Sequence, residues 1–231
     1  MRMVYSIELT RIAYHYRAVG SHPRFFRALV TGFLFLVVSL GINNLTNAYV
    51  NLHGETMSVQ DILLDHLPYV QLDDVYLEGF VIFIGCIALL GLHRPHKIPF
   101  LLKSVALFVA IRSFFMILTH LSLPLSQFEY QRDYAPLGGF LHLFSSGNDL
   151  FFSGHTGLPF LMALLFWKKP YLRVMFLAAS LIFGASVLLA RVHYSIDVFA
   201  AFFITYSIFH LAMWLFKTDY ALFMEPPSCN A

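Results

Sequence analysis

Charged residues and cysteines are scarce in this sequence. Only 12% of its 231 residues are charged, whereas 58% are hydrophobic and 17% are aromatic. The mean hydropathy is +0.69, and this balance excludes an ordinary water-soluble globular domain. The two cysteines, Cys86 and Cys229, are too few and too far apart for a disulfide framework or a thiolate metal site. The composition indicates an integral membrane protein, and no nucleic-acid partner is expected.

Long apolar runs divide the chain. A helix needs about 20 mostly apolar residues to cross the hydrocarbon core of a bilayer. The candidate runs cover residues 28–50, 75–92, 99–120, 152–167, 172–190 and 194–216. We therefore expect an all-α, polytopic membrane protein with six transmembrane helices in one bundle. The expected domains are an N-terminal segment (1–27), the six-helix catalytic domain (28–217) and a C-terminal tail (218–231).

Basic residues in the N-terminal segment and the loops predict the orientation. Residues 1–27 carry five arginines and one acid, Glu8, among aromatic residues, a pattern that favours an amphipathic helix at the membrane interface. Further basic clusters lie at 93–97, at 168–173 and at Lys217, whereas the 51–78 loop is acidic. Because lysine and arginine accumulate in cytoplasmic loops, both termini are predicted to be cytoplasmic. His155 and His193 then share the opposite face, which is periplasmic, lumenal or extracellular.

Two short motifs near the ends of apolar runs carry candidate chemistry. In the first, Asp149 or Ser153 can cap a helix that begins near His155. The free N–H groups and the dipole at a helix N-terminus favour a phosphate group there. His155 can then donate a proton to a leaving oxygen. This motif predicts a phosphate site with an acid beside it.

The second motif pairs His193 with Asp197. The two residues are four apart, so on a helix they would share one face. A carboxylate bound to one imidazole nitrogen fixes the tautomer and leaves the other nitrogen to attack or to accept a proton. Arg112 and Arg191 can neutralise phosphate oxygens. An arginine inside an apolar span, such as Arg112, normally faces a polar cavity.

These residues resemble a known family. The sequences Ser153-Gly154-His155 and His193…Asp197 are similar to the second and third motifs of the type 2 phosphatidic acid phosphatase superfamily. The sphingomyelin synthase branch is more similar still, as shown by Asn148-Asp149-Leu150-Phe151-Phe152-Ser153-Gly154-His155-Thr156 and His193-Tyr194-Ser195-Ile196-Asp197-Val198. The segment 112–119 resembles the arginine motif of that branch, and 61–65 resembles part of its first motif. From the residues alone, Asp61 and Asp65 also fit a solvated acidic loop.

Two differences from the phosphatases favour the synthase branch. The phosphatases carry Ser-Arg shortly before the third-motif histidine, and here Ser186 is followed by Val187. Their opening Lys-x6-Arg-Pro motif is absent as well. The sequence also departs from the synthase branch, because Ser58-Val59-Gln60 stands in place of its Pro-Leu-Pro and Asn148 in place of its glycine. The resemblance covers about residues 58–210.

The resemblance implies a two-step transfer of a phospho-head group (phosphocholine or phosphoethanolamine). His193 attacks the phosphorus of a membrane phospholipid and releases diacylglycerol, His155 acts as acid and then as base, and Asp197 orients His193. The acceptor is a lipid alcohol such as ceramide or a diacylglycerol-type lipid. No cofactor and no metal are implied. The residues implied to bind substrate or phosphate are Arg112, Asp149, Ser153, Gly154, Thr156, Arg191 and Tyr194.

Other functions remain open at the level of the sequence. Within the enzyme class, a lipid phosphate phosphatase or a phospholipase C-like hydrolase would use the same histidines with water as the acceptor. A transporter or channel would distribute polar groups across the depth of the membrane and show internal repeats, whereas here they gather toward one face. A membrane scaffold would have no need of both motifs. The oligomeric state is not predicted.

Overall fold

The computed structural model describes residues 16, 19–20, 23–53, 59–119, 124 and 150–225. Every regular element in these ranges is helical, and there is no strand among them. Five helical stretches in this part of the chain are long and apolar enough to cross a membrane. The predicted all-α membrane fold is therefore confirmed at this level.

The long helices follow the predicted apolar runs closely. They are α2 (Pro23–His53), α4 (Gly79–His93), α5 (Ile98–Leu118), α8 (Pro170–Leu189) and α9 (Ser195–Leu215). A π-helical turn, η1 (Asp74–Glu78), leads directly into α4, and a 3-10 turn, η2 (Pro95–Lys97), leads into α5. The described residues also form three shorter helices, namely α3 (Ile62–His66), α7 (Gly154–Leu165) and α10 (Lys217–Met224).

The fourth predicted span is shorter than expected. Helix α7 has 12 residues, which at 1.5 Å per residue is about 18 Å, whereas the hydrocarbon core is about 30 Å thick. Its start is fixed by the Ser153 cap and by Phe151, whose φ of 61° is incompatible with a right-handed helix. Its end precedes the sequence Lys168-Lys169-Pro170. The helix is present at the predicted place, but among the described residues only the other five predicted spans meet the length criterion.

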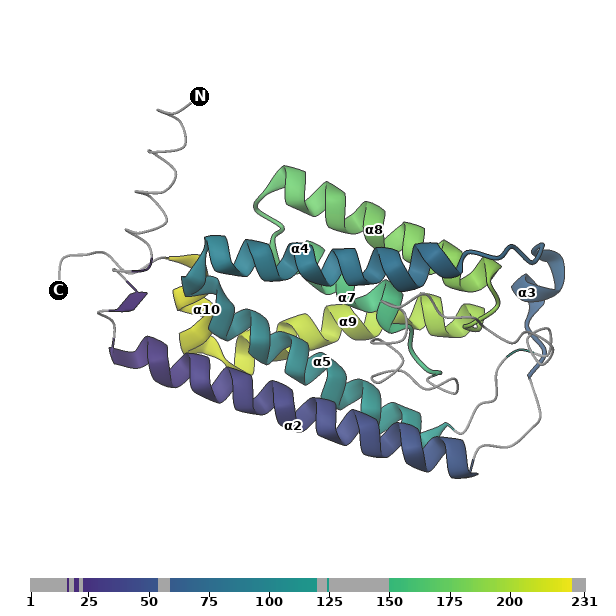
Figure 1. Cartoon of the computed structure of the whole chain (residues 1–231), viewed down its shortest axis with the longest axis horizontal. Coiled ribbons are helices and arrows are strands. Elements are labelled where there is room, and N and C mark those ends of the chain that lie inside the picture. Colours follow the sequence, from purple (N-terminus) through teal and green to yellow (C-terminus); the bar gives the residue numbers. More distant parts are fainter. Residues whose placement is uncertain are drawn as a thin grey trace.

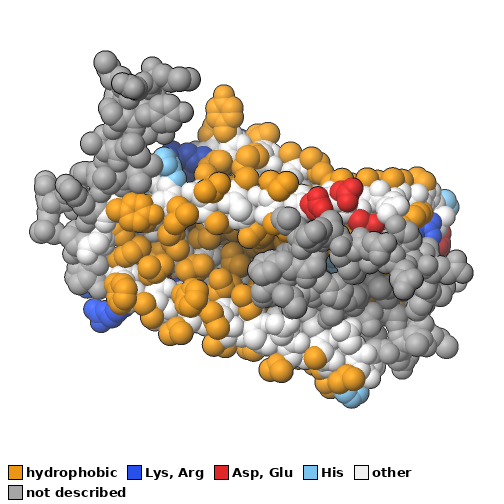
Figure 2. Space-filling model, viewed as in Figure 1, with side chains coloured by type: hydrophobic (Ala, Val, Ile, Leu, Met, Phe, Trp, Pro, Cys, Tyr) orange, Lys and Arg blue, Asp and Glu red, His pale blue; other side chains and the backbone are white. Residues whose placement is uncertain are grey.

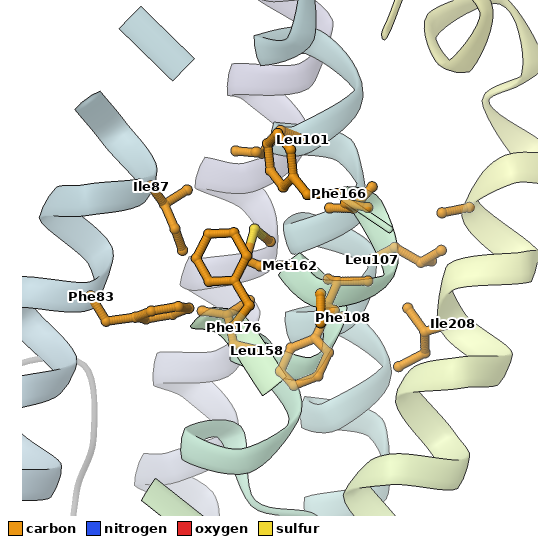
Figure 3. Close-up of a cluster of buried hydrophobic side chains, with 14 of the residues drawn as sticks. Phe83, Ile87, Leu101, Leu107, Phe108, Leu158, Met162, Phe166, Phe176 and Ile208 are labelled. Atoms are coloured by element: carbon orange, nitrogen blue, oxygen red, sulfur yellow. The ribbon is translucent and has the colours of Figure 1, made fainter. Parts of the chain in front are cut away.

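The helices form one elongated bundle (Figure 1). Helix α2 packs along α5, and α7 packs against both α8 and α9. Phenylalanine rings fill much of the interior; Phe83 of α4 and Phe176 of α8, for example, lie edge to face with centroids 5.9 Å apart. Figure 3 shows this cluster, with Met162 of α7 and Ile208 of α9 among the side chains that meet there. The buried cluster holds α7 inside the bundle.

One end of the bundle is basic. The start of α2, the η2 turn and α10 lie at this end (Figure 1). Helix α10 is held there by the Lys103–Asp219 ion pair, 2.6 Å long, which joins it to α5. The opposite end holds α3 and the turn between α8 and α9. Figure 2 shows hydrophobic side chains spread over the face between these ends, as expected of a surface in contact with lipid.

Two predicted segments lie largely outside the described residues. Of the predicted amphipathic segment 1–27, the description covers Tyr16, residues 19–20 and the start of α2. Of the predicted tail 218–231, residues 218–225 are described, and most of them belong to α10. The amphipathic helix and the cytoplasmic location of both termini therefore stay predictions.

Candidate active site

His193 and Asp197 form the centre of the candidate site. The Nδ1 atom of His193 lies 3.2 Å from Oδ2 of Asp197, and the two residues are 4% and 0% exposed. The same carboxylate oxygen accepts a hydrogen bond of 3.0 Å from the backbone N–H of Tyr194. Asp197 is therefore fixed by the backbone of the turn, and its contact with Nδ1 leaves Nε2 of His193 as the nitrogen available for reaction.

The predicted contact is present, but its geometry differs from the prediction. Helix α9 begins at Ser195, so His193 precedes the helix and does not share a helical face with Asp197. Asp197 is the third residue of α9 and reaches back toward the chain before the helix, as an acidic residue does in a capping box. Helix capping, and not i,i+4 spacing along a helix, brings the pair together.

His155 lies next to this pair at the start of α7. Its ring centroid is 6.3 Å from that of His193. On its other sides His155 contacts aromatic rings, with Phe80 of α4 at 4.6 Å and Tyr76 of η1 at 5.7 Å between centroids. The fold thus brings together two histidines that are 38 positions apart in the sequence, and apolar rings form part of the wall beside them.

The two motifs are also joined through the backbone. The N–H of Ser153 donates a 2.9 Å hydrogen bond to the carbonyl oxygen of Asp197, so the start of α7 is fixed to the start of α9. The Ser153 hydroxyl caps α7 by accepting from the N–H of Thr156 at 3.4 Å. The predicted capping role of Ser153 is confirmed, and the cap leaves the N-terminus of α7 beside His155.

Arg112 reaches this N-terminus from α5. Its Nε donates a 2.9 Å hydrogen bond to the carbonyl oxygen of Phe152, and the residue is 7% exposed. A Cβ atom placed on Gly154 would lie 3.6 Å from the same Nε, so the guanidinium runs directly past the first residue of α7. A buried cation and a helix N-terminus therefore lie together beside His155, and both attract an anion.

The other predicted site residues have local structural contacts. The Thr156 carbonyl accepts a 2.7 Å hydrogen bond from the Ser180 hydroxyl, and the Thr156 hydroxyl points toward Gly184 of α8. Arg191 donates from Nη2 to the carbonyls of Leu64 and Leu67, both at 3.1 Å. Burial raises the pKa of the Tyr194 phenol. These contacts explain how the residues are held, and their predicted roles in binding substrate stay predictions.

Asp149 lies outside the described residues, and so does the rest of the 125–149 segment. No group of three or more His, Cys, Asp or Glu side chains in the described ranges is arranged to hold a metal ion. The described site brings together two imidazoles, a carboxylate, a guanidinium and a helix N-terminus.

Three residues at or beside the site have little or no signal in the sequence. Tyr76 and Phe80 give no signal, because nothing in their local sequence relates them to a histidine 75 or more positions away. Asp61 was singled out only in part, because residues 61–65 resemble part of the first motif of the synthase branch. Burial alone would raise the pKa of its carboxyl group, but hydrogen bonds from Ser195, Leu63 and Leu64 outweigh burial and lower it.

The part of the chain that contains the candidate site matches a protein-family model. Residues 146–214 match the family model described as PAP2 superfamily C-terminal, a stretch that covers less than half of the chain but contains both histidine motifs. A search of curated proteins found no match. The family match supports the type 2 phosphatidic acid phosphatase superfamily, and with it a membrane enzyme of the lipid phosphatase or phosphotransferase type.

Proposed function

We propose that the chain is a lipid phosphotransferase that moves a phospho-head group from a glycerophospholipid to a lipid alcohol such as ceramide. The observation that carries the proposal is the pairing of His155 with the His193–Asp197 dyad, at a centroid distance of 6.3 Å. The rings are close enough for one phosphoester to contact both. Phosphoryl transfer through a histidine needs this combination of a nucleophile and a second acid–base group.

In the first step, Nε2 of His193 attacks the phosphorus of the donor lipid. A P–N bond forms and the bond between phosphorus and the glycerol oxygen breaks, while His155 gives a proton to that oxygen and diacylglycerol leaves. Asp197 stabilises the positive charge that develops on His193, because it contacts Nδ1 at 3.2 Å. Arg112 and the N-terminus of α7 stabilise the charged phosphate oxygens.

In the second step, the hydroxyl of the acceptor attacks the phosphorus of the phosphohistidine. Its proton passes to His155, which is neutral after the first step, and the P–N bond breaks. The site returns to its starting protonation state, so no external acid or base is consumed. With water in place of the lipid alcohol, the same steps would give hydrolysis.

The preference for transfer rests on the sequence. The position after Ser186, where the phosphatases carry an arginine, holds Val187, which is 0% exposed and packs in the bundle beside Tyr194 and Val198. A buried valine cannot bind a phosphate oxygen. Arg112 instead supplies the described cation nearest the start of α7, as expected of the synthase branch.

The proposal is tested by incubating the purified protein with isotopically labelled phosphatidylcholine or phosphatidylethanolamine, with and without ceramide, and identifying the lipid products by mass spectrometry. We expect labelled diacylglycerol and a head-group-bearing ceramide. Release of diacylglycerol with a free phospho-head group, unaffected by ceramide, would identify a hydrolase. An absence of turnover of any lipid phosphoester would overturn the enzyme assignment.

Variants of the two histidines test the mechanism. We expect His193→Ala and His155→Ala each to lower the turnover by about 10²-fold or more, because each removes a positioned acid–base or nucleophilic group. His210→Ala is a matched control, because His210 is exposed on α9, away from the site, and its ring meets that of Tyr206 edge-on. Thermal unfolding of each variant in detergent shows whether the fold is retained. Full activity in either site variant would contradict the mechanism.

A further inference from the structure

Residues 59–70, between α2 and η1, contact the turn that carries His193. Besides Asp61, four of these residues bind this turn or its flanks. The N–H of Val59 donates to the Tyr194 hydroxyl at 3.2 Å, and the N–H of Val70 donates to the carbonyl of Leu189 at 3.0 Å. The carbonyls of Leu64 and Leu67 accept from Arg191. We call residues 59–70 the clamp segment.

Asp61 makes the densest contact between the clamp segment and the turn. Its Oδ2 accepts from the backbone N–H of Ser195 at 2.7 Å, and the Ser195 hydroxyl lies 2.6 Å from both carboxylate oxygens. Oδ1 also accepts from the N–H groups of Leu63 and Leu64, which caps α3. One carboxylate therefore caps two helices, α3 and α9, that are more than 130 positions apart.

The position of Asp61 relates it directly to the reacting groups. Ser195 is the first residue of α9, and it lies between His193 and Asp197 in the sequence. The N–H of Tyr194 is held by Asp197, and the N–H of Ser195 is held by Asp61. Two carboxylates thus fix two consecutive amides directly after His193. Arg191, two residues before His193, adopts a left-handed φ of 51°, which its bonds to the clamp segment help to maintain.

We infer that Asp61 is a positioning residue of the active site, which fixes the start of α9 through Ser195 and thereby holds His193 against Asp197. The inference rests on the proposed function for its kinetic consequence. Its structural part, the restraint of the turn by the clamp segment, stands independently. Asp61 does not contact the reacting groups, so it acts through the geometry of the His193–Asp197 pair.

The variant Asp61→Asn separates positioning from simple helix capping. Asparagine caps helices as well as aspartate does, so the bonds to Leu63 and Leu64 persist. The variant loses the negative charge and one of the two acceptor oxygens that Ser195 uses. Asp65→Asn is the matched control, because Asp65 lies on the same short helix, is exposed and carries the same charge.

We expect Asp61→Asn to lower kcat by roughly 10- to 100-fold, the scale of small misplacements of catalytic groups, with KM for the donor lipid nearly unchanged. Asp65→Asn should retain wild-type kcat. Ser195→Ala should lower kcat less than Asp61→Asn, because it removes the hydroxyl donor and keeps the N–H. When Asp61→Asn and Ser195→Ala are combined, the fold-decrease in kcat should be smaller than the product of the two single decreases, because both changes remove parts of one contact.

Hydrogen–deuterium exchange of residues 189–198 provides a readout that does not need activity. We expect faster exchange in Asp61→Asn than in Asp65→Asn, because the Ser195 amide loses its partner. Faster exchange with unchanged kcat would overturn the positioning role, and unchanged exchange would overturn the clamp itself. If the wild-type protein acts on no lipid phosphoester, the proposed function fails, and the exchange comparison still decides whether the clamp segment restrains the turn.

Discussion

At the scale of single residues, the site depends on carboxylates that serve more than one partner. Asp197 holds both the His193 ring and the Tyr194 amide, and Asp61 holds Ser195 and the start of α3. A shared carboxylate couples the position of a side chain to the position of the backbone. The histidine cannot move without disturbing the start of α9.

The negative charge of Asp61 makes the stability of the folded protein depend on pH. Hydrogen bonds lower the pKa of its carboxyl group in the folded protein below the ordinary value of 3.8. The stabilisation is therefore fully present above the pKa of the unfolded chain, and it is lost as the pH falls through the folded pKa. We expect Asp61→Asn to lower the Tm at neutral pH and to lower it progressively less below about pH 4.

Thermal unfolding in detergent across this pH range measures the effect. Asp65→Asn serves as the control for loss of a charge from the same segment. A difference in Tm between wild type and Asp61→Asn that stays constant, or grows, as the pH falls would contradict the assignment of the stabilisation to the ionised carboxylate.

At the scale of elements, α7 depends on a close approach between helices. A Cβ atom on Gly157 would lie 2.8 Å from the Phe108 ring of α5 and 2.8 Å from the Thr205 hydroxyl of α9. Neither neighbour has room to move, because both are buried and Phe108 packs edge to face on Phe152 with centroids 5.3 Å apart. Glycine is required here for packing and not for its backbone conformation.

We expect Gly157→Ala to destabilise the folded protein by about 1–3 kcal/mol, the usual cost of overpacking a tight contact. The displaced Phe108 ring would press on Phe152, whose carbonyl anchors Arg112, so activity should fall as well. Gly85→Ala is the control, because a Cβ atom at Gly85 of α4 meets nothing within 4 Å. Equal unfolding temperatures for the two variants would contradict the close packing of α7.

The sequence predicts the helices better than it predicts how they end. The apolar runs, which end at charged residues or prolines, predict where all six helices lie. They do so because the hydropathy of a segment depends mainly on its composition. Phe152 belongs to the fourth predicted run, yet the left-handed φ of Phe151 and the Ser153 cap delay the start of α7 to Gly154. Hydropathy does not distinguish an apolar residue in a helix from one in the turn before it.

The same limit applies to the site. His155, His193 and Asp197 could be predicted from short motifs, because the types of these residues and their spacing in the sequence identify them. The rings of Tyr76 and Phe80 could not, since their contact with His155 exists only after η1 and α7 pack together. The contact between Asp61 and Ser195 likewise joins segments 134 positions apart. Tertiary packing supplies these parts.

At the scale of the whole molecule, the bundle has two chemically different ends. Lys97 and Lys217 lie at the end that holds α10, where Lys97 stacks over Phe223. The candidate site lies toward the other end, beside α3 and the turn between α8 and α9. Basic residues favour the cytoplasm, so we predict that the site faces away from it.

Cysteine labelling tests this orientation. In a variant without Cys86 and Cys229, a single cysteine is placed by Tyr69→Cys in the clamp segment or by Lys168→Cys in the turn between α7 and α8; both positions are exposed. We expect a membrane-impermeant maleimide to label the first only from the non-cytoplasmic side and the second only from the cytoplasmic side. The reverse pattern would overturn the predicted orientation.

The shortness of α7 has a consequence for where the lipid must go. The start of α7 is joined to the start of α9 by the hydrogen bond from Ser153 to Asp197, so the two N-termini lie at the same depth. Helix α9 has 21 residues and α7 has 12, so α7 is about 14 Å shorter at 1.5 Å per residue, and the missing length falls at its far end, after Leu165. A lipid phosphate that reaches the N-terminus of α7 therefore also reaches His193, and a single depth in the membrane serves both histidines.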